Sequence, residues 1–151
     1  RVLDLFCGLG NFTLPIATRA GEAVGVEGDA ALIRKAADNA ARNGLGNAHF
    51  HLADLNATPG AAAWLQRGYD SVLIDPPRSG AEKLLPWIAE GNAQQVLYIS
   101  CNPETLARDA GILVNNYGFR LEGAGILDMF PHTPHSEAIA LFERNRPRKK
   151  Q

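Results

Sequence analysis

Short apolar runs alternate with amphipathic segments along most of the chain. The runs are about four to six residues long, and an apolar run of this length between turn-forming residues is typical of a buried strand. The segments between them place apolar residues at helical spacing, as Ile33, Ala36 and Ala40 show. We therefore expect strands at residues 1–6, 23–27, 48–53, 71–75 and 96–101, and helices at 13–19, 29–42, 61–67, 82–90 and 104–116.

Two further runs, 119–129 and 137–143, follow the last helix with no helix between them. Strands that alternate with helices indicate an α/β fold with a doubly wound, mostly parallel sheet. No internal repeat or linker interrupts the pattern. We expect one domain over residues 1–143, followed by a basic tail at residues 144–151.

In a doubly wound sheet, ligands bind beyond the carboxyl ends of the strands. The unusual residues of this sequence occur at those ends: the turn 6–10, Glu27, Asp54, Asp75 and Cys101. Packing alone does not account for polar or special residues at five strand ends. The sequence therefore predicts a ligand site at this edge of the sheet.

The glycine-rich turn after the first strand lets a ligand approach the backbone closely at Gly8 and Gly10. Glu27, 17 residues beyond Gly10, can accept hydrogen bonds from ribose hydroxyls. A dinucleotide fingerprint would have a third small residue at position 13, where Thr13 stands, so NAD is disfavoured. Acidic residues in or after four strands strengthen the nucleotide interpretation: Asp4, Glu27, Asp54 and Asp75.

Cys101 ends an apolar run and is followed at once by a helix start. Asn102 is a good N-cap, and Pro103 suits the first helical position, where its missing N–H costs nothing. The positive end of a helix favours the thiolate, which is the nucleophilic form of cysteine. A nucleophile and a buried structural cysteine both remain open for Cys101, whereas we expect Cys7 to be structural.

Composition excludes several other classes of protein. Two cysteines are too few for a disulfide scaffold or a thiolate metal cluster. His132 and His135 have no further ligand pair nearby, so no metal site is expected. No apolar run approaches ~18 residues and nothing resembles a signal peptide, so we expect a cytoplasmic protein without membrane contact.

Charge is unevenly distributed along the chain. The tail holds five of the fifteen basic residues and no acidic residue, which leaves residues 1–143 with a formal charge of −6. Such tails are usually disordered and can contact nucleic acid. The body is not an obvious polyanion binder by itself.

Several motifs together resemble the signatures of the RNA uracil-5-methyltransferases. They are DLFCGLGNF at 4–12, VE at 26–27, DPPRSG at 75–80, SCNP at 100–103 and HSE at 135–137. The match covers the chain up to about Glu143. TLARD at 105–109 and LDMFPHT at 127–133 resemble the 23S ribosomal RNA branch of the family more than the transfer RNA branch.

The resemblance implies a Rossmann-like class I fold, with seven strands and an antiparallel last strand. It implies S-adenosylmethionine as methyl donor and a uridine of 23S ribosomal RNA as substrate. We also expect a monomer. Larger members of the family carry an N-terminal RNA-binding barrel and an insert with an iron–sulfur cluster, which we expect outside this chain. The matching cofactor positions are Phe6, Gly8, Gly10, Asn11, Glu27, Asp54 and Asp75, with Cys101 as nucleophile and Glu137 as base.

Uracil C5 is a weak nucleophile until a thiolate adds at C6, and its proton must leave after methyl transfer, so one cysteine and one base are needed. Asp75 could face the donor or the uracil edge, and Arg78 could bind phosphate or pair with an acid. Phe130 and His132 could flank an extruded base.

Three alternatives remain at this stage. A transfer RNA uracil-5-methyltransferase would share the motifs. An RNA cytosine-5-methyltransferase would carry a cysteine after the proline of the fourth-strand motif, where Pro77 stands. The chain could also be a cofactor- or RNA-binding fragment that is inactive without N-terminal domains.

Overall fold

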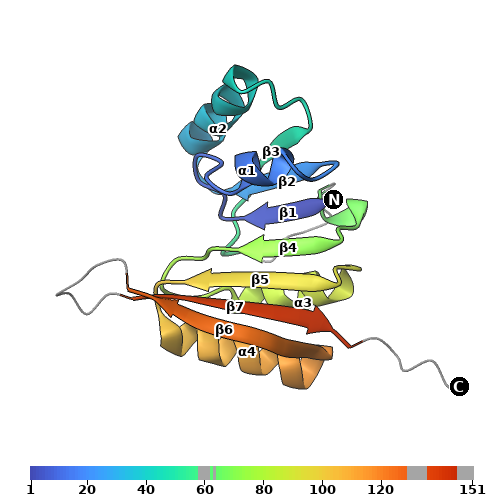
Figure 1. Cartoon of the computed structure of the whole chain (residues 1–151), viewed down its shortest axis with the longest axis vertical. Helices are drawn as coiled ribbons and strands as arrows, with labels where there is room; N and C mark the ends of the chain where they lie inside the picture. Colours follow the sequence, from blue (N-terminus) through green and yellow to red (C-terminus); the bar gives the residue numbers. More distant parts are fainter. Residues whose placement is uncertain (58–61, 63, 129–135, 146–151) are drawn as a thin grey trace, which may run out of the picture.

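A computed structural model describes residues 1–57, 62, 64–128 and 136–145. Seven strands form one sheet in the order β3-β2-β1-β4-β5-β7-β6, in which β1 to β5 run parallel and β7 is antiparallel to both of its neighbours (Figure 1). The mostly parallel sheet and its antiparallel last strand are confirmed. The strands are β1 Val2–Leu5, β2 Ala23–Glu27, β3 Ala48–Leu52, β4 Ser71–Ile74, β5 Gln95–Ser100, β6 Phe119–Leu127 and β7 Glu137–Arg144.

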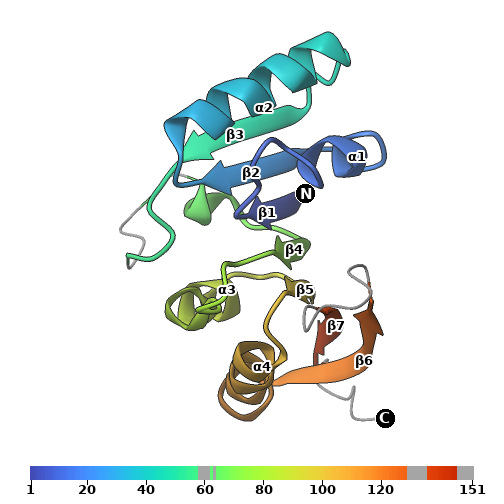
Figure 2. The ribbon, with the colours of Figure 1, turned by 90° about the vertical axis from the view of Figure 1, so that its left-hand side faces the viewer.

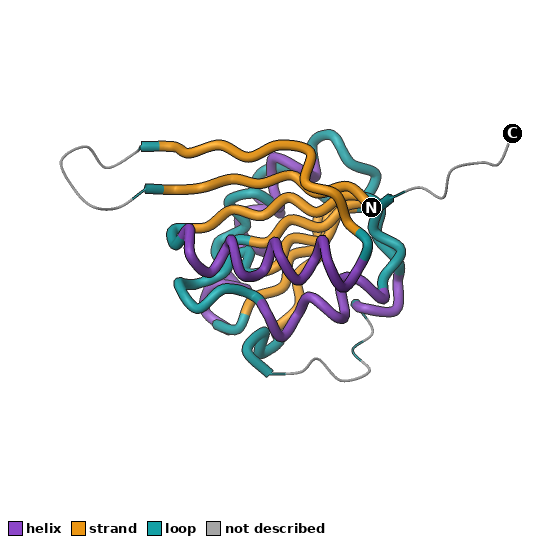
Figure 3. Tube along the Cα trace, turned by 90° about the horizontal axis from the view of Figure 1, so that it is seen from below, coloured by secondary structure: helices purple, strands orange, loops and turns teal. Residues whose placement is uncertain are grey.

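Helices lie on both faces of the sheet. Of these, α1 and α2 pack against the β1–β3 half, and α3 and α4 lie on the other face of the β4–β7 half (Figure 2). The view from below shows α4 running along the twisted sheet (Figure 3). The helices are α1 Thr13–Ala17, α2 Ala30–Arg42, α3 Leu85–Glu90 and α4 Pro103–Tyr117, with short 3₁₀ turns η1 Leu65–Arg67 and η2 Glu82–Leu84.

The core lies between β1, β4, β5, β7 and the helices α3 and α4. Alternate residues of β5 and β7 point into it, because successive side chains of a strand face opposite sides of the sheet. Tyr98, Phe119, Phe142 and Leu113 are all fully buried there. No helix within the described ranges is long and apolar enough to cross a bilayer.

Some element boundaries differ from those expected. The predicted helix 82–90 is divided into η2 and α3, because Pro86 has no N–H for a continuous helical ladder and fits the first turn of α3. The predicted helix 61–67 is only the 3₁₀ turn η1 in its described part. At the carboxyl end, β7 continues through Arg144, one residue beyond the expected end of the domain.

Candidate active site

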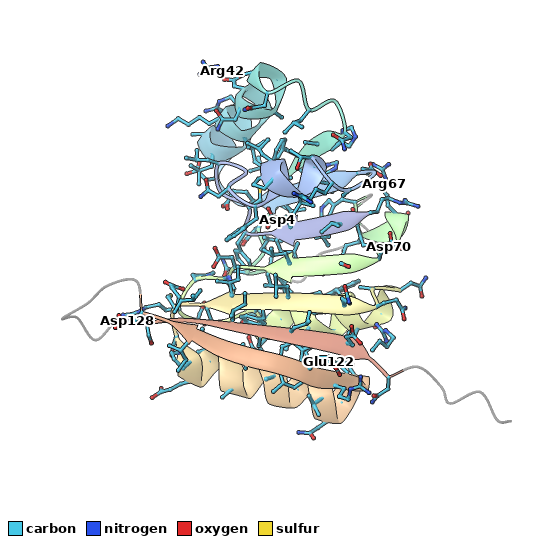
Figure 4. The ribbon with its side chains drawn as sticks, in the orientation of Figure 1. Asp4, Arg42, Arg67, Asp70, Glu122 and Asp128 are labelled. Atoms are coloured by element: carbon cyan, nitrogen blue, oxygen red, sulfur yellow. The ribbon has the colours of Figure 1, made fainter. Side chains whose placement is uncertain are left out.

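One edge of the sheet gathers the functional side chains predicted from the sequence. The strands β1, β4 and β5 end at this edge, where β6 also ends and the antiparallel β7 begins (Figure 1). Asp128, just after β6, lies here, whereas Asp70 and Glu122 lie at the opposite edge (Figure 4). Along the site edge, in the order of the strands, stand Asp54, Glu27, the turn after β1, Asp75, Cys101 and Glu137.

The turn after β1 has an unusual backbone. Phe6 has φ 64°, the only positive φ of a non-glycine residue in the described part of the chain, and Gly8 and Gly10 have φ 54° and 85°. A residue with a side chain at such a φ is strained, and such strain is concentrated at functional sites. A Cβ at Gly8 would meet no atom of the described residues within 4 Å, so among these residues open space lies beside this backbone. Asn11 is exposed on the same turn.

Glu27 is held beside this turn by backbone donors. Its Oε2 accepts from Gly8 N at 3.1 Å, and its Oε1 accepts from Gly28 N at 2.7 Å and from Asp29 N at 3.1 Å. A carboxylate has about four acceptor positions, so these three bonds fix the group and leave room for one further donor. Asp54, by contrast, is exposed after β3, where its Oδ1 accepts from Asn56 N.

Beneath the turn lies a buried pair whose role the sequence did not reveal. Asp4 is 1% exposed; its Oδ2 accepts from Thr13 Oγ1 at 2.5 Å, while its Oδ1 has no partner within the described residues. Burial, reinforced by the charge of Asp75, raises the pKa of Asp4 to about 7. The sequence did offer one indication of this pair, because Asp4 is an acidic residue inside an otherwise apolar strand. Its partner Thr13 had served only as an argument against NAD.

Close packing on β2 supports this pair. A Cβ at Gly25 would lie 2.8 Å from Cys7 Sγ and 2.9 Å from Thr13 Oγ1, so only glycine fits at this position. Cys7 is buried, and burial first, then the charges of Asp4 and Glu27, raise the pKa of its thiol to about 12. These surroundings make Cys7 a packing residue.

Cys101 stands between β5 and α4, as predicted. Ser100 Oγ accepts from Asn102 N at 3.0 Å, and Asn102 Oδ1 accepts from Glu104 N at 3.1 Å, so Asn102 caps the helix that begins at Pro103. The cysteine itself is partly exposed and free. Its thiol is thus accessible next to the N-terminus of a 15-residue helix, an arrangement compatible with the nucleophile interpretation.

Glu137 and Asp75 stand on either side of Cys101. The antiparallel register pairs Ser100, the last residue of β5, with Ala138, so Cys101, which follows β5, lies next to Glu137, the first residue of β7. Asp75 directly follows β4 on the other side of β5. Burial, together with the nearby charge of Glu137, raises the pKa of Asp75. One thiol and two carboxyl groups therefore share one end of the site.

The two residues predicted to flank an extruded base, Phe130 and His132, lie outside the described residues, as does His135 of the HSE motif. Among the residues that are described, no group of three or more His, Cys, Asp or Glu side chains is placed to hold a metal ion.

The residues at the β1–β3 end of this edge fit S-adenosylmethionine. Glu27 offers an acceptor to a ribose, and Asp54 lies farther along the edge, where it can face a base. The open space at Gly8 admits a ligand against the backbone, and Asp4 Oδ1, which has no hydrogen-bond partner among the described residues, is an acceptor beneath it. The site therefore offers hydrogen-bond acceptors and a backbone that a ligand can approach closely. A ligand with hydroxyl and ammonium donors requires both.

Comparisons with known proteins agree with this geometry. The 23S rRNA (uracil(1939)-C(5))-methyltransferase RlmD of Methylococcus capsulatus is 58% identical over 144 residues, which are 95% of this chain and 32% of that protein. The protein of the same name from Stenotrophomonas maltophilia (strain R551-3) is 57% identical over the same shares. The chain thus spans about a third of the length of these relatives.

Solved structures show the same fold. The Pyrococcus abyssi tRNA (uracil-54, C5)-methyltransferase in complex with S-adenosyl-L-homocysteine has a TM-score of 0.80 and 32% identity, over 94% of this chain and 34% of that one. Magnesium protoporphyrin IX methyltransferase from Synechocystis, with the same ligand, has a TM-score of 0.72 over 95% of this chain and 73% of its own, but its 18% identity bears on the fold alone. The fold is that of the class I S-adenosylmethionine-dependent methyltransferases.

The model of the tRNA (uracil-5-)-methyltransferase family matches residues 1–145, nearly the whole chain. This match, the identity with the relatives above and the shared fold lead to one assignment: the chain belongs to the tRNA (uracil-5-)-methyltransferase family.

Proposed function

We propose that this chain is the catalytic domain of an enzyme that methylates C5 of a uridine in 23S ribosomal RNA. The observation that carries the proposal is the adjacency of Cys101 and Glu137 across β5 and β7, next to Asp75. A thiol and a facing base are the two groups that C5 methylation of uracil requires. The names of the relatives, which are 56–58% identical, favour 23S ribosomal RNA as the substrate.

S-adenosylmethionine would lie along the β1–β3 end of the edge. Glu27 would hold the ribose, Asp54 the base, and Phe6 to Asn11, with Gly8 and Gly10, the methionine part. When bound, this cofactor supplies an electrophilic methyl group. The order of the strands then places Asp75 between the cofactor residues and Cys101.

The thiolate of Cys101 begins the reaction by forming a bond from Sγ to C6 of the uracil. The electron pair of the C5–C6 double bond moves toward C5 and O4, which makes C5 nucleophilic. On elimination, Cys101 leaves C6 again as the thiolate, next to the N-terminus of α4.

Glu137 completes the reaction as the base. After C5 has gained the methyl group, the carboxylate takes the remaining C5 proton, the double bond to C6 re-forms, and the bond to Cys101 Sγ breaks. Asp75, which follows β4, is the second candidate for the base, and burial and the charge of Glu137 raise its pKa. We assign it to the uracil edge, because β4 lies between β1, whose turn is proposed to hold the cofactor, and β5, which ends next to Cys101.

Substitutions of Cys101 and Glu137 test the mechanism, because they should fail in different ways. In the full-length parent protein, Cys101→Ala should abolish both adduct formation and methyl transfer. Glu137→Gln should still add and methylate, but turnover should fall about 10²- to 10⁴-fold, the usual contribution of a general base. Unable to eliminate, this variant should accumulate RNA covalently bound to protein.

A denaturing gel of labelled 23S ribosomal RNA gives the readout. A retarded band for Glu137→Gln, absent for Cys101→Ala, supports the mechanism, and Glu143→Gln on the same strand is the control that should behave as wild type. An active Cys101→Ala enzyme would refute covalent catalysis. An active Glu137→Gln enzyme without adduct would transfer the role of base to Asp75, and methylation of transfer RNA but not 23S ribosomal RNA would correct the substrate.

A further inference from the structure

A buried carboxylate behind the active site joins three elements. Asp109, in the second turn of α4, has no exposed surface. Its Oδ2 accepts from the Tyr98 hydroxyl on β5 at 2.6 Å and from Ala81 N, after β4, at 2.7 Å. Its Oδ1 accepts from Arg108 Nε at 2.8 Å. Burial and the bond to Asp109 raise the pKa of Tyr98, which keeps its hydroxyl a donor.

The same helix binds the backbone of the segment that follows Asp75. Asn102 Nδ2 and Thr105 Oγ1 donate to the carbonyl of Arg78 at 3.0 and 3.2 Å. Arg108 Nη2 donates to the carbonyl of Ser79 at 2.9 Å. With Asp109 on Ala81 N, side chains from the cap and first two turns of α4 thus bond residues 78, 79 and 81.

Gly80 makes this close approach possible. Its φ is +78°, and a Cβ there would lie 2.5 Å from Arg108 Nη2 and 2.7 Å from Asp109 Oδ2. Any side chain would force segment 78–81 away from α4. The glycine of the DPPRSG motif therefore belongs to this contact, which we call the Asp109 clamp: Asp109, Tyr98, Arg108 and residues 78–81.

The clamp connects the segment that follows Asp75 to the helix that follows Cys101, and so fixes how far apart these two residues lie. Segment 78–81 begins three residues after Asp75, and the bonding helix begins two residues after Cys101. Through its hydrogen bond to Asp109, Tyr98 connects the segment and the helix to β5, the strand that ends beside Cys101. A small misplacement of reacting groups costs large factors in rate, because catalysis depends on attack geometry.

We infer that Asp109 is a positioning residue for methyl transfer, which holds Asp75 and its loop in register with Cys101 without touching substrate. This inference rests on the proposed function. The cofactor contacts of Glu27, Gly8 and Asp54 lie at the other end of the edge and involve no atom of the clamp. The clamp should therefore govern the rate of the chemical step and leave cofactor affinity unchanged.

Asp109→Asn in the full-length parent protein tests the inference, because asparagine keeps the size but turns an amide N–H₂ toward one of the donors. We expect kcat on unmodified 23S ribosomal RNA to fall at least tenfold, with the Kd for S-adenosylhomocysteine within twofold of wild type. Tyr98→Phe removes one donor and should lower kcat by about two- to threefold. Hydrogen exchange at the Ala81 amide should become at least tenfold faster in Asp109→Asn.

Leu113→Val is the matched control, because Leu113 is fully buried in the same helix but bonds no part of the loop. It should lower the melting temperature yet keep at least half of the wild-type kcat. Equal loss of kcat in Leu113→Val and Asp109→Asn, or wild-type kcat in Asp109→Asn, would overturn the inference. A wild-type protein that does not methylate 23S ribosomal RNA would instead refute the proposed function, and Ala81 exchange would then still report whether the clamp exists.

Discussion

Asp4 shows how one residue can have both a structural cost and a use in binding. Its carboxyl group is buried with one oxygen satisfied by Thr13 and the other without a partner among the described residues. Leaving a buried acceptor without a hydrogen bond costs about 1–3 kcal/mol. Such a cost at the floor of a glycine turn is expected where a ligand supplies the missing donor.

Asp4→Asn should change how stability depends on pH. The folded-state pKa of Asp4 is about 7, against 3.8 in the unfolded chain. Between pH 4 and 7 only the unfolded chain releases this proton, so the wild type loses stability as pH rises through this window. A pKa difference of three units corresponds to roughly 4 kcal/mol, which is the upper bound on the stability that the wild type loses across this pH window. Asp4→Asn has no carboxyl group at this position, so its stability should not show this loss. Denaturant unfolding at pH 4 to 8 measures the difference.

Thr13→Val provides the companion measurement. The Thr13 hydroxyl lowers the pKa of Asp4, so its removal should move the upper end of the window above pH 7. Parallel stability curves for wild type and Asp4→Asn would contradict the raised pKa.

At the scale of the elements, most of the site could be predicted because it depends on where strands end. An apolar run followed by a polar residue is a local pattern, and the structure confirms that Glu27, Asp75 and Cys101 lie at the carboxyl ends of their strands. The Asp109 clamp could not be predicted, because the bonds from Asp109 and Arg108 to segment 78–81 join side chains to backbone atoms 28 and 29 positions away. Register likewise placed Glu137 beside Cys101, which the spacing of the motifs alone does not specify.

Arg144 illustrates the same limit. It opens a basic run and was therefore assigned to the tail, but its guanidinium donates to the carbonyls of Ala89, Gly91 and Ala93 at 2.8–3.0 Å. It also lies 4.6 Å from the centre of the Phe119 ring. The last residue of β7 thus satisfies carbonyls at the end of α3, which lack helical partners.

Arg144→Ala should destabilise the fold, because it leaves these carbonyls without donors and removes a cation–π contact. We expect a loss of about 2 kcal/mol, or a melting temperature lower by about 4–8 °C for a chain of this size. Arg144→Lys should recover part of the loss, since an ammonium cannot reproduce the planar fork. Arg120→Ala is the control, because Arg120 is an exposed residue of neighbouring β6. Equal melting temperatures for the two alanine variants would refute the role of Arg144.

At the scale of the whole molecule, the basic run at the end of the chain is separate in sequence from the residues proposed for cofactor binding and catalysis. The residues proposed to bind the cofactor occupy the β1–β3 end of the site edge and those proposed for catalysis the β5–β7 end, with Asp75 between them. Residues 1–143 have a formal charge of −6, so their net charge does not favour binding to the phosphates of RNA. Since Arg144 is committed to the fold, four basic residues remain beyond β7: Arg146, Arg148, Lys149 and Lys150.

These four residues should supply salt-dependent affinity for RNA. Replacing all four by glutamine in the parent protein should weaken binding to a 23S ribosomal RNA fragment at low salt. Because each neutralised phosphate contributes about 0.7 to the logarithmic salt slope on single strands, the slope should fall by up to about 3. The control replaces Arg34, Lys35 and Arg42 on α2, at the far end of the molecule from β6 and β7 (Figures 1 and 4). Filter binding from 50 to 300 mM salt measures the salt slope of both variants. An unchanged slope in the tail variant, or an equal change in the α2 variant, would show that the tail makes no specific contribution to RNA affinity.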